Sequence, residues 1–547
     1  MVDSREICDE CFQLKPVFSP KRPESSKIAG MSKDEPYTLS KIIATLGPAS
    51  GAAEQIAQLI RQGARVFRIN FSHGSFDDFA DMLAQVRQAA QDTQTYVGVL
   101  GDLCGPKLRI GQVVDGGVAV KKGQSIAVCV ADRIGGRDQP CDEDVAGDSN
   151  NLDVEEAGAQ VAAVFSTNSP EVIDDIEPGH RLLINDGAVR TIVLEVRGEG
   201  DDKRLICKVT TAGVISSAKG INLPDSNLRV PSLTDYDRQC VQWALANEID
   251  WLALSFVRAA SDIVELKELI ESQCEDLNKR IPVIAKIEKP QAIDDLDAIV
   301  QESDAIMVAR GDLGVEMDLT IVPIIQKRII TLARDLGKPV IVATQMLQSM
   351  IENAQPTRAE VSDVANALFD GAGAVMLSGE TAVGAFPKRA VAVMSQIARK
   401  TQAHALTDEQ LKEQWARPPR WRMSRRRSAA LAFGVRNIVN DYEAKLVVIW
   451  SQASGGARFL SAARLSVPIF AMSSDVHTLY RMNMLFGVHP LHMELPESTE
   501  AFAHMLEPKL LQYGWCDKGD PYVLVAGEPI GTVGSTNSVS LRYLGES

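Results

Sequence analysis

Three side chains that could do chemistry together stand at the ends of two apolar segments. Lys286 and Glu288 lie at the end of one segment, residues 282–287, and Asp312 lies just beyond the next, residues 305–309. Residues two apart in a strand point to the same face, so Lys286 and Glu288 share one. A plain ion pair is one interpretation of that spacing. The other is chemical. Two carboxylates from adjacent strand ends suit a Mg²⁺ ion that keeps waters, and a lysine beside it suits a migrating phosphoryl group or an enolate.

Alternating strands and helices must position these side chains. Residues 291–303, between the two apolar segments, have helical periodicity, which makes strand, helix and strand one parallel β/α unit. The alternation gives eight strands, at residues 41–46, 65–70, 96–102, 251–256, 282–287, 305–309, 339–344 and 374–377. Eight units predict a (β/α)₈ TIM barrel, in which chemistry occurs at the carboxyl ends of the strands. The polar side chains at those ends are Arg68, Asn70, Ser72, Asp102, Arg109, Lys286, Glu288, Asp312, Thr344 and Ser378.

The barrel pattern is interrupted once and is followed by a further unit. Across residues 111–222 helical periodicity vanishes and short alternating runs are separated by Gly and Asp, which predicts an inserted all-β domain. The barrel is then formed by residues 37–110 and 223–398. Residues 1–36 are polar and contain several prolines, so they are expected to form an N-terminal tail. Residues 399–547 are expected to form a C-terminal α/β domain.

The C-terminal domain contains a candidate anion site. A turn rich in Ser and Gly, residues 451–456, stands between a buried strand at 445–450 and a helical pattern. Strand, glycine-rich turn and helix form a common phosphate cradle, because the N–H groups at the start of a helix attract anions. The same arrangement is also a common structural turn. A phosphorylated allosteric effector and a plain turn therefore remain alternatives.

Composition limits the classes of function. The 547 residues are 45% hydrophobic and 24% charged, which is ordinary for a globular protein of more than one domain. The net charge of −15 argues against nucleic-acid binding. No apolar run reaches the roughly 18 residues of a membrane helix, and residues 1–30 lack the apolar core of a secretory signal. Nine cysteines are scattered, and Cys8 and Cys11 form a CxxC without a second pair, so we expect a cytoplasmic location and neither a disulfide framework nor a zinc site.

The motifs of the chain, in their order and spacing, resemble those of the pyruvate kinases from about residue 38 to the C-terminus. They are KIIATLGPAS (41–50), RINFSHG (68–74), GDLCGPKLRIG (101–111), KGINLP (219–224), IAKIEKPQ (284–291), MVARGDLGVE (307–316), VATQMLQSM (342–350), PTRAEVSDVANALFDG (356–371) and VMLSGETAVG (375–384). The resemblance implies a barrel, an inserted domain that closes over the site as a lid, and a C-terminal domain for assembly and effectors. It also implies the last step of glycolysis, in which a phosphoryl group passes from phosphoenolpyruvate to ADP and the enolate is protonated to pyruvate.

The resemblance implies roles for individual residues as well. Arg68 and Lys286 hold the phosphoryl group, and Lys286 neutralises charge during the transfer. Glu288 and Asp312 are the ligands of Mg²⁺ or Mn²⁺. Gly311 lies against the substrate carboxylate, and Thr344 lies on the face where the methyl carbon is protonated. The nucleotide-side residues are Asn70, His73, Arg109 and Lys219.

One departure from the family concerns the monovalent cation. Members that need K⁺ usually carry Thr-Lys after the aspartate and a Glu three residues further on, whereas here Leu103 and Cys104 follow, and then Lys107. A fixed ammonium supplies the field of K⁺ and disfavours the ion by like charge. In the family a Lys here accompanies activity without K⁺, so we expect that K⁺ is not required. The weak or vestigial K⁺ site is then Asn70, Ser72, Asp102 and Leu103.

Two other functions remain open. A Mg²⁺-dependent lyase acting on pyruvate-like enolates uses similar barrel carboxylates but does not account for the inserted β domain. A catalytically inactive regulatory paralogue would normally have lost one of Lys286, Glu288 and Asp312. The family further implies a homotetramer, with the helix at 357–371 as an interface element. The loop at 451–456 lacks a Lys and Arg458 lies beyond its glycines, which leaves a sugar monophosphate, a nucleotide or no effector.

Overall fold

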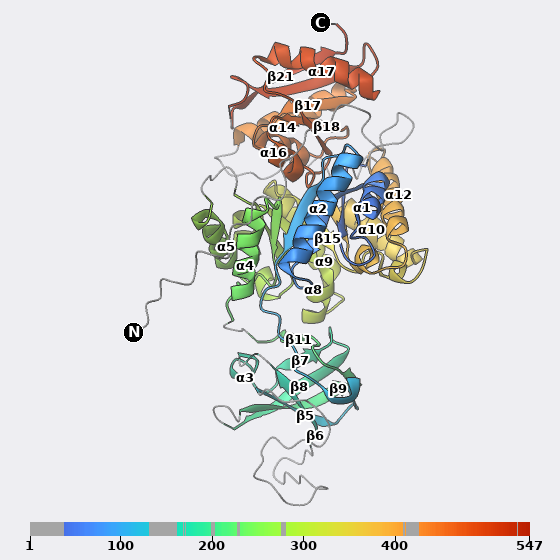
Figure 1. Cartoon of the computed structure of the whole chain (residues 1–547). Coiled ribbons are helices and arrows are strands. Elements are labelled where there is room, and N and C mark those ends of the chain that lie inside the picture. The colour runs from blue at the N-terminus through green and yellow to red at the C-terminus, as the bar shows by residue number, and fades with distance from the viewer. Residues whose placement is uncertain are drawn as a thin grey trace, which may run out of the picture.

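The structure, a computed structural model, describes residues 38–130, 161–167, 169, 171–198, 203–226, 230–274, 280–408, 411, 426–532 and 534–546. Three modules lie along its long axis, with the inserted domain at one end, the barrel in the middle and the C-terminal domain at the other end (Figure 1). The predicted tail at residues 1–36, with Cys8 and Cys11, lies outside the described residues. Within the described part of the chain, no helix is long and apolar enough to cross a membrane.

Eight parallel strands close into a barrel in the order β1-β16-β15-β14-β13-β12-β3-β2. The strands are near-continuous apolar runs, because the barrel interior buries one face and the surrounding helices bury the other. This confirms the predicted (β/α)₈ barrel, and the predicted strand ends differ from the observed ones by no more than two residues. The bounds are β1 Lys41–Thr45, β2 Ala64–Asn70, β3 Gly98–Asp102, β12 Trp251–Leu254, β13 Val283–Ile287, β14 Ala305–Ala309, β15 Val340–Ala343 and β16 Ala374–Leu377.

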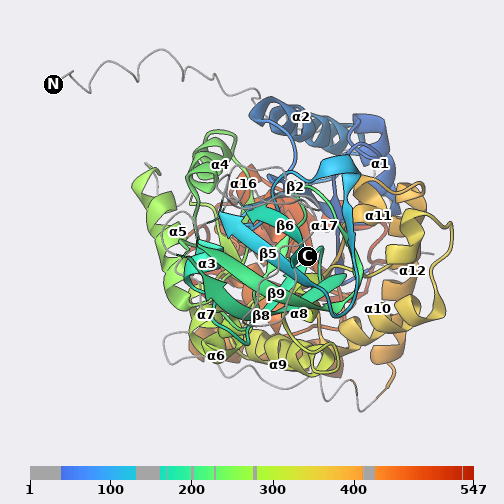
Figure 2. The ribbon, with the colours of Figure 1, turned by 90° about the horizontal axis from the view of Figure 1, so that it is seen from below.

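Helices surround the barrel (Figure 2). Capping boxes begin three of them, at Ser75, Thr234 and Thr357, where the hydroxyl and the carboxylate three residues later satisfy each other's backbone N–H groups. The helices are α1 Ala53–Gln62, α2 Phe76–Asp92, α4 Asp235–Ala246, α5 Ala260–Ser272, α6 Gln291–Asp294, α7 Leu296–Glu302, α8 Arg310–Glu316, α9 Val322–Asp335, η4 Gln348–Ile351, α10 Arg358–Asp370, α11 Gly379–Ala382 and α12 Pro387–Ala405.

The single helix predicted at residues 291–303 is wrong in one respect, because it is broken into α6 and α7. Asp295, at the break, has φ −102° and ψ 20°. Its carboxylate accepts a hydrogen bond from the Ala260 backbone N–H at 2.7 Å, at the start of α5. A tertiary contact therefore interrupts a segment whose apolar spacing is that of one continuous helix.

The inserted domain is all-β, as predicted. A larger sheet has the order β11-β7-β8-β9-β5-β6, and a small sheet pairs β10 with β4. The domain has an apolar cluster of its own, around Phe165 and Leu182. The elements are η1 Val114–Gly116, β4 Val118–Val120, β5 Ser125–Val130, β6 Val161–Thr167, α3 Glu171–Asp174, β7 Arg181–Ile184, β8 Val189–Arg197, β9 Arg204–Thr211, β10 Gly213–Ile215 and β11 Ile221–Asn222.

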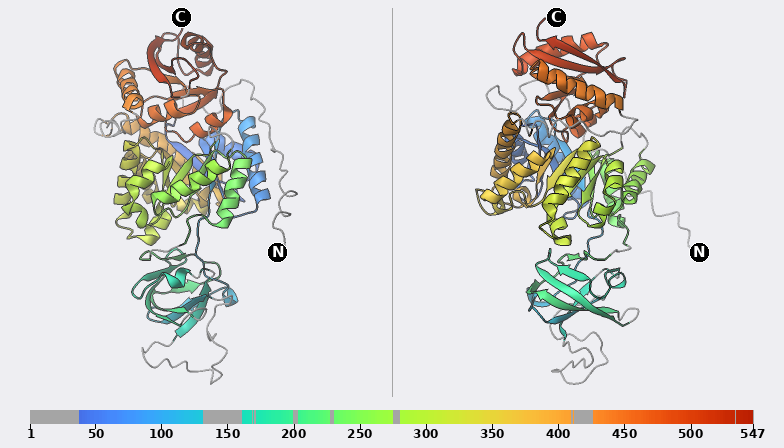
Figure 3. Two further views of the ribbon diagram at one scale, coloured as in Figure 1. Left: turned by 90° about the vertical axis from the view of Figure 1, so that its left-hand side faces the viewer. Right: turned by 180° about the vertical axis from the view of Figure 1, so that it is seen from behind.

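The C-terminal domain is the expected α/β unit. Its sheet has the order β19-β18-β17-β20-β21, with β21 antiparallel at one edge and helices on both faces (Figure 3). Apolar clusters lie on each side of the sheet. The elements are α14 Arg426–Asp441, β17 Leu446–Trp450, α15 Gly455–Ala462, β18 Ile469–Ser473, α16 Val476–Met482, β19 Val488–His492, α17 Thr499–Tyr513, β20 Pro521–Gly527 and β21 Thr536–Tyr543.

The C-terminal domain covers the amino ends of the barrel strands. Lys41 on β1 is 2% exposed, and its Nζ donates to the Val488 carbonyl at 2.5 Å. The Trp251 indole on β12 donates to the Arg481 carbonyl at 3.2 Å. On β3, a Cβ added to Gly98 would lie 2.8 Å from the Tyr480 carbonyl oxygen. This end of the barrel is therefore closed by backbone from another domain, and the carboxyl ends face the inserted domain.

Candidate active site

The Lys286 ammonium lies at the centre of a buried charged cluster at the carboxyl end of the barrel. Its Nζ lies 3.1 Å from Glu288 Oε1 and 3.3 Å from Asp102 Oδ1, and it donates to Ser255 Oγ at 2.8 Å. These partners come from three neighbouring strand ends, those of β13, β3 and β12. Lys286 and Glu288 do face the same way, as their spacing predicts. The lysine is 9% exposed, and both carboxylates are 1% exposed.

Asp102 holds a second cation with its other oxygen. Arg68 Nε donates to Asp102 Oδ2 at 2.6 Å, and Arg68 Nη1 donates to Thr45 Oγ1 at 3.2 Å. Burial alone would raise the pKa of Asp102, but Lys286 and Arg68 outweigh it and lower the pKa. Asp102 therefore keeps its charge and separates two cations that would otherwise repel each other.

The charges around Lys286 also fix its protonation state. Burial works against the ammonium, but the carboxylates of Asp102 and Glu288 outweigh it and raise the pKa of Lys286 above its usual value. Asp312 adds to that effect, while Arg68 opposes it. The lysine is consequently a fixed positive charge rather than a base at neutral pH.

Glu288 and Asp312 form a pair of carboxylates that repel each other. Glu288 Oε2 accepts from the Phe256 backbone N–H at 2.8 Å. Burial raises the pKa of Glu288, and the Asp312 carboxylate raises it further, against the pull of Lys286. No cluster of three or more His, Cys, Asp or Glu side chains that could hold a metal occurs among the described residues. Two nearby carboxylates still fit a divalent cation that takes its other ligands from water and substrate, because such an ion relieves their repulsion.

Gly311 and Thr344 meet at the ends of β14 and β15. The Gly311 backbone N–H donates to Thr344 Oγ1 at 2.6 Å, and that hydroxyl donates to the Ala343 carbonyl at 2.6 Å. Thr344 has φ +67° and Gln345 has φ +55°, a backbone region that is costly for a β-branched residue such as threonine. Strain of this kind is held at functional sites by the surrounding structure.

Arg109 and Lys219, two of the residues expected on the nucleotide side, lie where two chain segments join the barrel to the lid. Arg109 Nη1 donates to the Ala218 carbonyl at 2.8 Å, and the Ile110 backbone N–H donates to the Lys219 carbonyl at 2.8 Å. His73 is exposed. Burial lowers its pKa, and the fields of Lys107, Arg109 and Arg68 lower it further. The structure therefore brings His73 into the same cationic neighbourhood as Arg68.

The four positions of the expected K⁺ site lie at the carboxyl ends of the neighbouring strands β2 and β3, and each has protein partners. Asn70 Oδ1 accepts from the Ser72 backbone N–H at 3.2 Å. The Leu103 carbonyl accepts from Ser255 Oγ at 2.6 Å, and Asp102 binds two cations as described. Lys107 is exposed.

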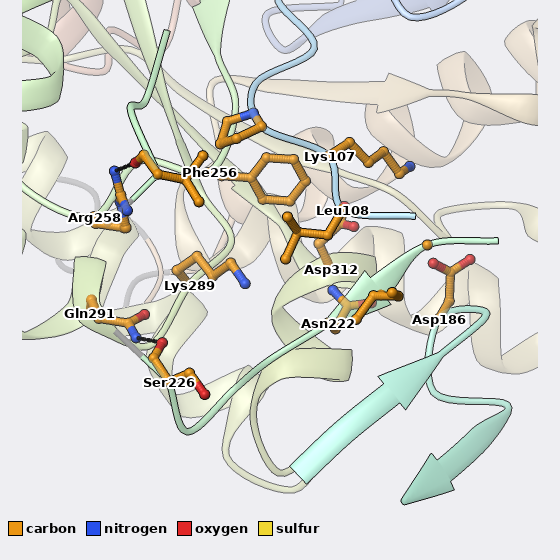
Figure 4. Close-up of a pocket in the computed structure, with 14 residues that line it drawn as sticks. Lys107, Leu108, Asp186, Asn222, Ser226, Phe256, Arg258, Lys289, Gln291 and Asp312 are labelled. Atoms are coloured by element: carbon orange, nitrogen blue, oxygen red, sulfur yellow. Dashed lines mark hydrogen bonds between the residues drawn. The ribbon is translucent and has the colours of Figure 1, made fainter. Parts of the chain in front are cut away.

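A pocket lies between the barrel and the lid, next to Asp312 (Figure 4). Barrel residues Phe256, Arg258 and Lys289 line one side of it, and Lys107 and Asn222 line the side of the chain segments that lead to the lid. The pocket joins apolar surface to cations beside Asp312.

The sequence did not identify several residues that complete the site. Ser255 and Phe256 were seen only as a strand end, yet they bind Lys286 and Glu288. Phe256 has φ +55°, which turns its N–H toward Glu288. Glu316 and Asn222, which bond to each other at 2.8 Å, were not singled out at all. The only sequence feature that could have identified them is that each is a polar residue inside a family motif. The partner of each lies far away in the sequence.

In the C-terminal domain, the Ser/Gly-rich turn lies between β17 and α15 as expected. Ser454 has φ +59°, and the Ala457 backbone N–H donates to Ser451 Oγ at 3.3 Å. Thr478 Oγ1 donates to the Gln452 carbonyl at 3.1 Å. The turn is thus held by the Ser451 hydroxyl from within and by the Thr478 hydroxyl of α16 from outside.

This fold and site define a barrel enzyme of the phosphotransferase class, with fixed cations beside two carboxylates under a β domain inserted after β3. Two family models match the chain: "Pyruvate kinase, barrel domain" at residues 37–391 and "Pyruvate kinase, alpha/beta domain" at residues 429–541. The chain belongs to the pyruvate kinase family, and its activity is the transfer of a phosphoryl group from phosphoenolpyruvate to ADP. That finding argues against an enolate lyase, and the presence of Lys286, Glu288 and Asp312 argues against an inactive paralogue.

Curated relatives and a solved structure agree. Pyruvate kinase from Mycobacterium intracellulare is 39% identical over 506 residues, covering 92% of this chain and 98% of the relative. Pyruvate kinase from Mycobacterium tuberculosis is 38% identical with the same coverage. A crystal structure of a pyruvate kinase from Cryptosporidium parvum superposes with a TM-score of 0.79 at 29% identity, covering 93% of this chain and 96% of that one.

Proposed function

We propose that Arg68 and Lys286 hold the phosphoryl group of phosphoenolpyruvate and that Lys286 neutralises charge as the group moves. The observation that carries this assignment is the pair of cations fixed on opposite oxygens of the buried Asp102. The phosphorus–oxygen bond to the enolate breaks, and a bond to a β-phosphate oxygen of ADP forms. Positive charges already in position cost no reorganisation during the transfer, which makes them effective.

Glu288 and Asp312 would hold the divalent cation, Mg²⁺ or Mn²⁺. Their mutual repulsion and their place beside Lys286 support this role. When bound, the metal supplies positive charge that orients the substrate oxygens and stabilises the charge of the enolate. The protein's own part is to fix the two carboxylates. Glu288 is held by Phe256 N–H, and Asp312 is carried on the first turn of α8.

On the substrate face, Gly311 would bind the substrate carboxylate and Thr344 would take part in protonation of the enolate. The Gly311 N–H donates to the Thr344 hydroxyl oxygen, so the two groups lie side by side, within reach of one bound carboxylate. The enolate left after transfer takes a proton at its methylene carbon and becomes pyruvate. We assign Thr344 to the path of that proton, through a water molecule. Asn70, His73, Arg109 and Lys219 would bind the nucleotide, since Arg109 and Lys219 lie on the segments that lead to the lid and His73 lies in the field of Arg109.

K⁺ is not required in this proposal. Asp102 already binds two cations, and the Leu103 carbonyl accepts from Ser255. Lys107 supplies a fixed positive charge in the same region, and its field reaches His73. Asn70, Ser72, Asp102 and Leu103 then form at most a weak K⁺ site.

Assembly and regulation follow the family. We propose a homotetramer in which the face around α8, α9 and α10 pairs with another copy, because Leu319, Ile324 and Val361 are exposed there at 64%, 66% and 37%. The turn at residues 451–456 would receive a phosphorylated allosteric effector at the start of α15. We place the enzyme in the cytoplasm and assign it neither nucleic-acid nor membrane partners.

Steady-state kinetics of the purified chain test the assignment. ATP and pyruvate are measured together, with phosphoenolpyruvate and ADP varied at fixed Mg²⁺ or Mn²⁺. We expect equal production of both products, dependent on the divalent ion. Activity that survives removal of all divalent cations, or that is unchanged in Asp312→Asn, would contradict the metal assignment.

A further inference from the structure

Glu316, the last residue of α8, joins the lid to the helix that carries Asp312. Its side chain is buried, and Oε1 accepts from Asn222 Nδ2 at 2.8 Å and from the Lys289 ammonium. Asn222 belongs to β11 and pairs with Leu183 of β7, so it is part of the lid sheet. The hydrogen bond between Asn222 and Glu316 therefore runs from the lid to the barrel.

Both barrel residues of this contact follow a proposed metal ligand closely in the sequence. Glu316 lies four residues after Asp312 on α8, which places the two carboxylates on the same face of that helix. Lys289 directly follows Glu288 at the end of β13. A displacement of Asn222 would therefore act on Asp312 through Glu316 and one turn of α8. It would act on Glu288 through Glu316 and Lys289, the residue that follows Glu288.

A second contact nearby has the same pattern. Gln291 Nε2 donates to the Ser226 carbonyl at 3.3 Å, and Gln291 lies three residues after Glu288 (Figure 4). Ser226 lies four residues beyond Asn222, on the segment that returns from the lid. The segment that returns from the lid is consequently bonded to the barrel at Glu316 and at Gln291. These two residues lie close in the sequence to Asp312 and Glu288, the proposed metal ligands.

The burial of Glu316 is costly, and stability does not explain it. A buried ion pair roughly breaks even against apolar residues of the same size. Among the described residues, Glu316 Oε2 has no hydrogen-bond partner, which adds a desolvation penalty. The buried Glu316 carboxylate between the two domains is therefore suited to linking the position of the lid to that of α8.

We propose that Glu316 is a positioning residue that couples the lid to the metal carboxylates. Through Asn222 it holds α8 so that Asp312 and Glu288 are set at the spacing that a divalent cation needs. It acts on the metal through Asp312 and touches neither substrate nor metal. This inference rests on the proposed function of Glu288 and Asp312 as metal ligands.

Mn²⁺ binding to the full-length protein tests the coupling. Free Mn²⁺ is followed by electron paramagnetic resonance, with and without ADP. Asn222→Ala removes the donor, and Asn222→Asp keeps the size but places a second carboxylate against Glu316. Ser217→Ala is the matched control, because Ser217 Oγ accepts from Val113 N–H at 2.8 Å, within the segments that lead to the lid.

We expect Mn²⁺ affinity to fall about tenfold in Asn222→Ala, the ratio equivalent to ~1.4 kcal/mol, and further in Asn222→Asp. Ser217→Ala should bind Mn²⁺ as the unaltered protein does. The isosteric Glu316→Gln, expected to weaken Mn²⁺ in the same direction, serves if Asn222→Ala fails to fold, and thermal unfolding of each variant reports folding.

Asp312→Asn distinguishes a failure of the coupling from a failure of the proposed metal site. If it abolishes Mn²⁺ binding while the Asn222 and Glu316 variants bind normally, the coupling is wrong and the metal assignment stands. If Asp312→Asn itself binds Mn²⁺ normally, the proposed metal site fails, and the coupling fails with it. A loss in Ser217→Ala equal to that in Asn222→Ala also overturns the coupling, because the effect would then be a general loosening of the lid.

Discussion

Arg68 on β2 donates from Nε to Oδ2 of Asp102 on the neighbouring strand β3 at 2.6 Å, while the residue opposite Asp102 in the register is Asn70. The other oxygen of that carboxylate faces Lys286 Nζ at 3.3 Å. One buried acid therefore sets the distance between the two cations that we propose hold the phosphoryl group. It contacts both cations and has no assigned contact with the substrate.

Replacing Asp102 by Asn should impair both activity and stability. The two cations would lose their shared counter-charge and repel each other, so kcat/KM for phosphoenolpyruvate should fall about 10²-fold. Breaking a buried ion pair on one side costs roughly 3–5 kcal/mol of unfolding free energy. Asp250→Asn is the control, since Asp250 is buried against Arg87 at the opposite end of the barrel. It should lose stability while kcat/KM stays the same, and equal kinetic losses in both variants would contradict the role of Asp102.

Lys286→Met should remove most of the catalysis. The ammonium contacts Asp102, Glu288 and Ser255 together. Without it, kcat should fall by about 10²–10³-fold, the usual effect of losing one group that stabilises developing charge. Lys338→Met, at the amino end of β15, is a matched control because that lysine donates to main-chain carbonyls. A Lys286 variant that retains near-normal kcat would refute the assignment.

Thr344→Val should separate phosphoryl transfer from protonation. Valine keeps the branched shape at φ +67° but loses the hydroxyl bonded to Gly311. Exchange of the methyl protons of pyruvate with solvent, followed by nuclear magnetic resonance, should slow about 10²-fold. Thr381→Val, whose hydroxyl donates to the Thr45 carbonyl, controls for the loss of a buried hydroxyl. Undiminished exchange in Thr344→Val would remove threonine from the proton path.

Lys41 should make stability depend on pH. Burial, together with Arg65, lowers its pKa from 10.5 to about 7. Between those values the unfolded chain binds more protons than the folded one, so the free energy of unfolding rises with pH. The rise is at most ~1.4 kcal/mol per pH unit, and it is absent below about pH 7. Lys41→Met should abolish it and the exposed Lys122→Met should not, as denaturant titrations at several pH values would test. An unaltered slope in Lys41→Met would contradict the prediction.

Exchanging Lys107 for Glu should create a response to K⁺. The unaltered protein is expected to turn over equally in Na⁺, K⁺ or a bulky organic cation, because the ammonium provides the positive field. In Lys107→Glu a carboxylate favours a bound cation, so K⁺ should activate several-fold more than Na⁺. Lys122→Met again serves as the control for a lost surface charge. Strong selective activation of the unaltered protein by K⁺ would end this explanation.

The features that local pattern encodes were predictable from the sequence. The eight strands are apolar runs, and their carboxyl ends carry polar residues at fixed positions, so the barrel and the central group of Lys286, Glu288 and Asp312 could be placed. The same reasoning put Lys286 and Glu288 on one face, which their 3.1 Å separation confirms.

What the sequence did not predict depends on contacts between distant segments. Asn222 and Glu316 lie 94 positions apart, and neither has a local pattern that indicates the other. Ser255 was seen as a strand end, but its bond to Lys286 follows from the way β12 lies beside β13. The break between α6 and α7 arises from the bond between Asp295 and Ala260. Local periodicity carries no information about such partners.

The way the C-terminal domain seals one end of the barrel bears on how this enzyme can be dissected. A chain cut after α12 would leave the Lys41 amine and the Trp251 indole without the Val488 and Arg481 carbonyls that receive them. Gly98, which makes room for the Tyr480 carbonyl, would face water instead. We therefore expect an excised barrel to be less stable than the full chain, and a poor vehicle for studying the reaction.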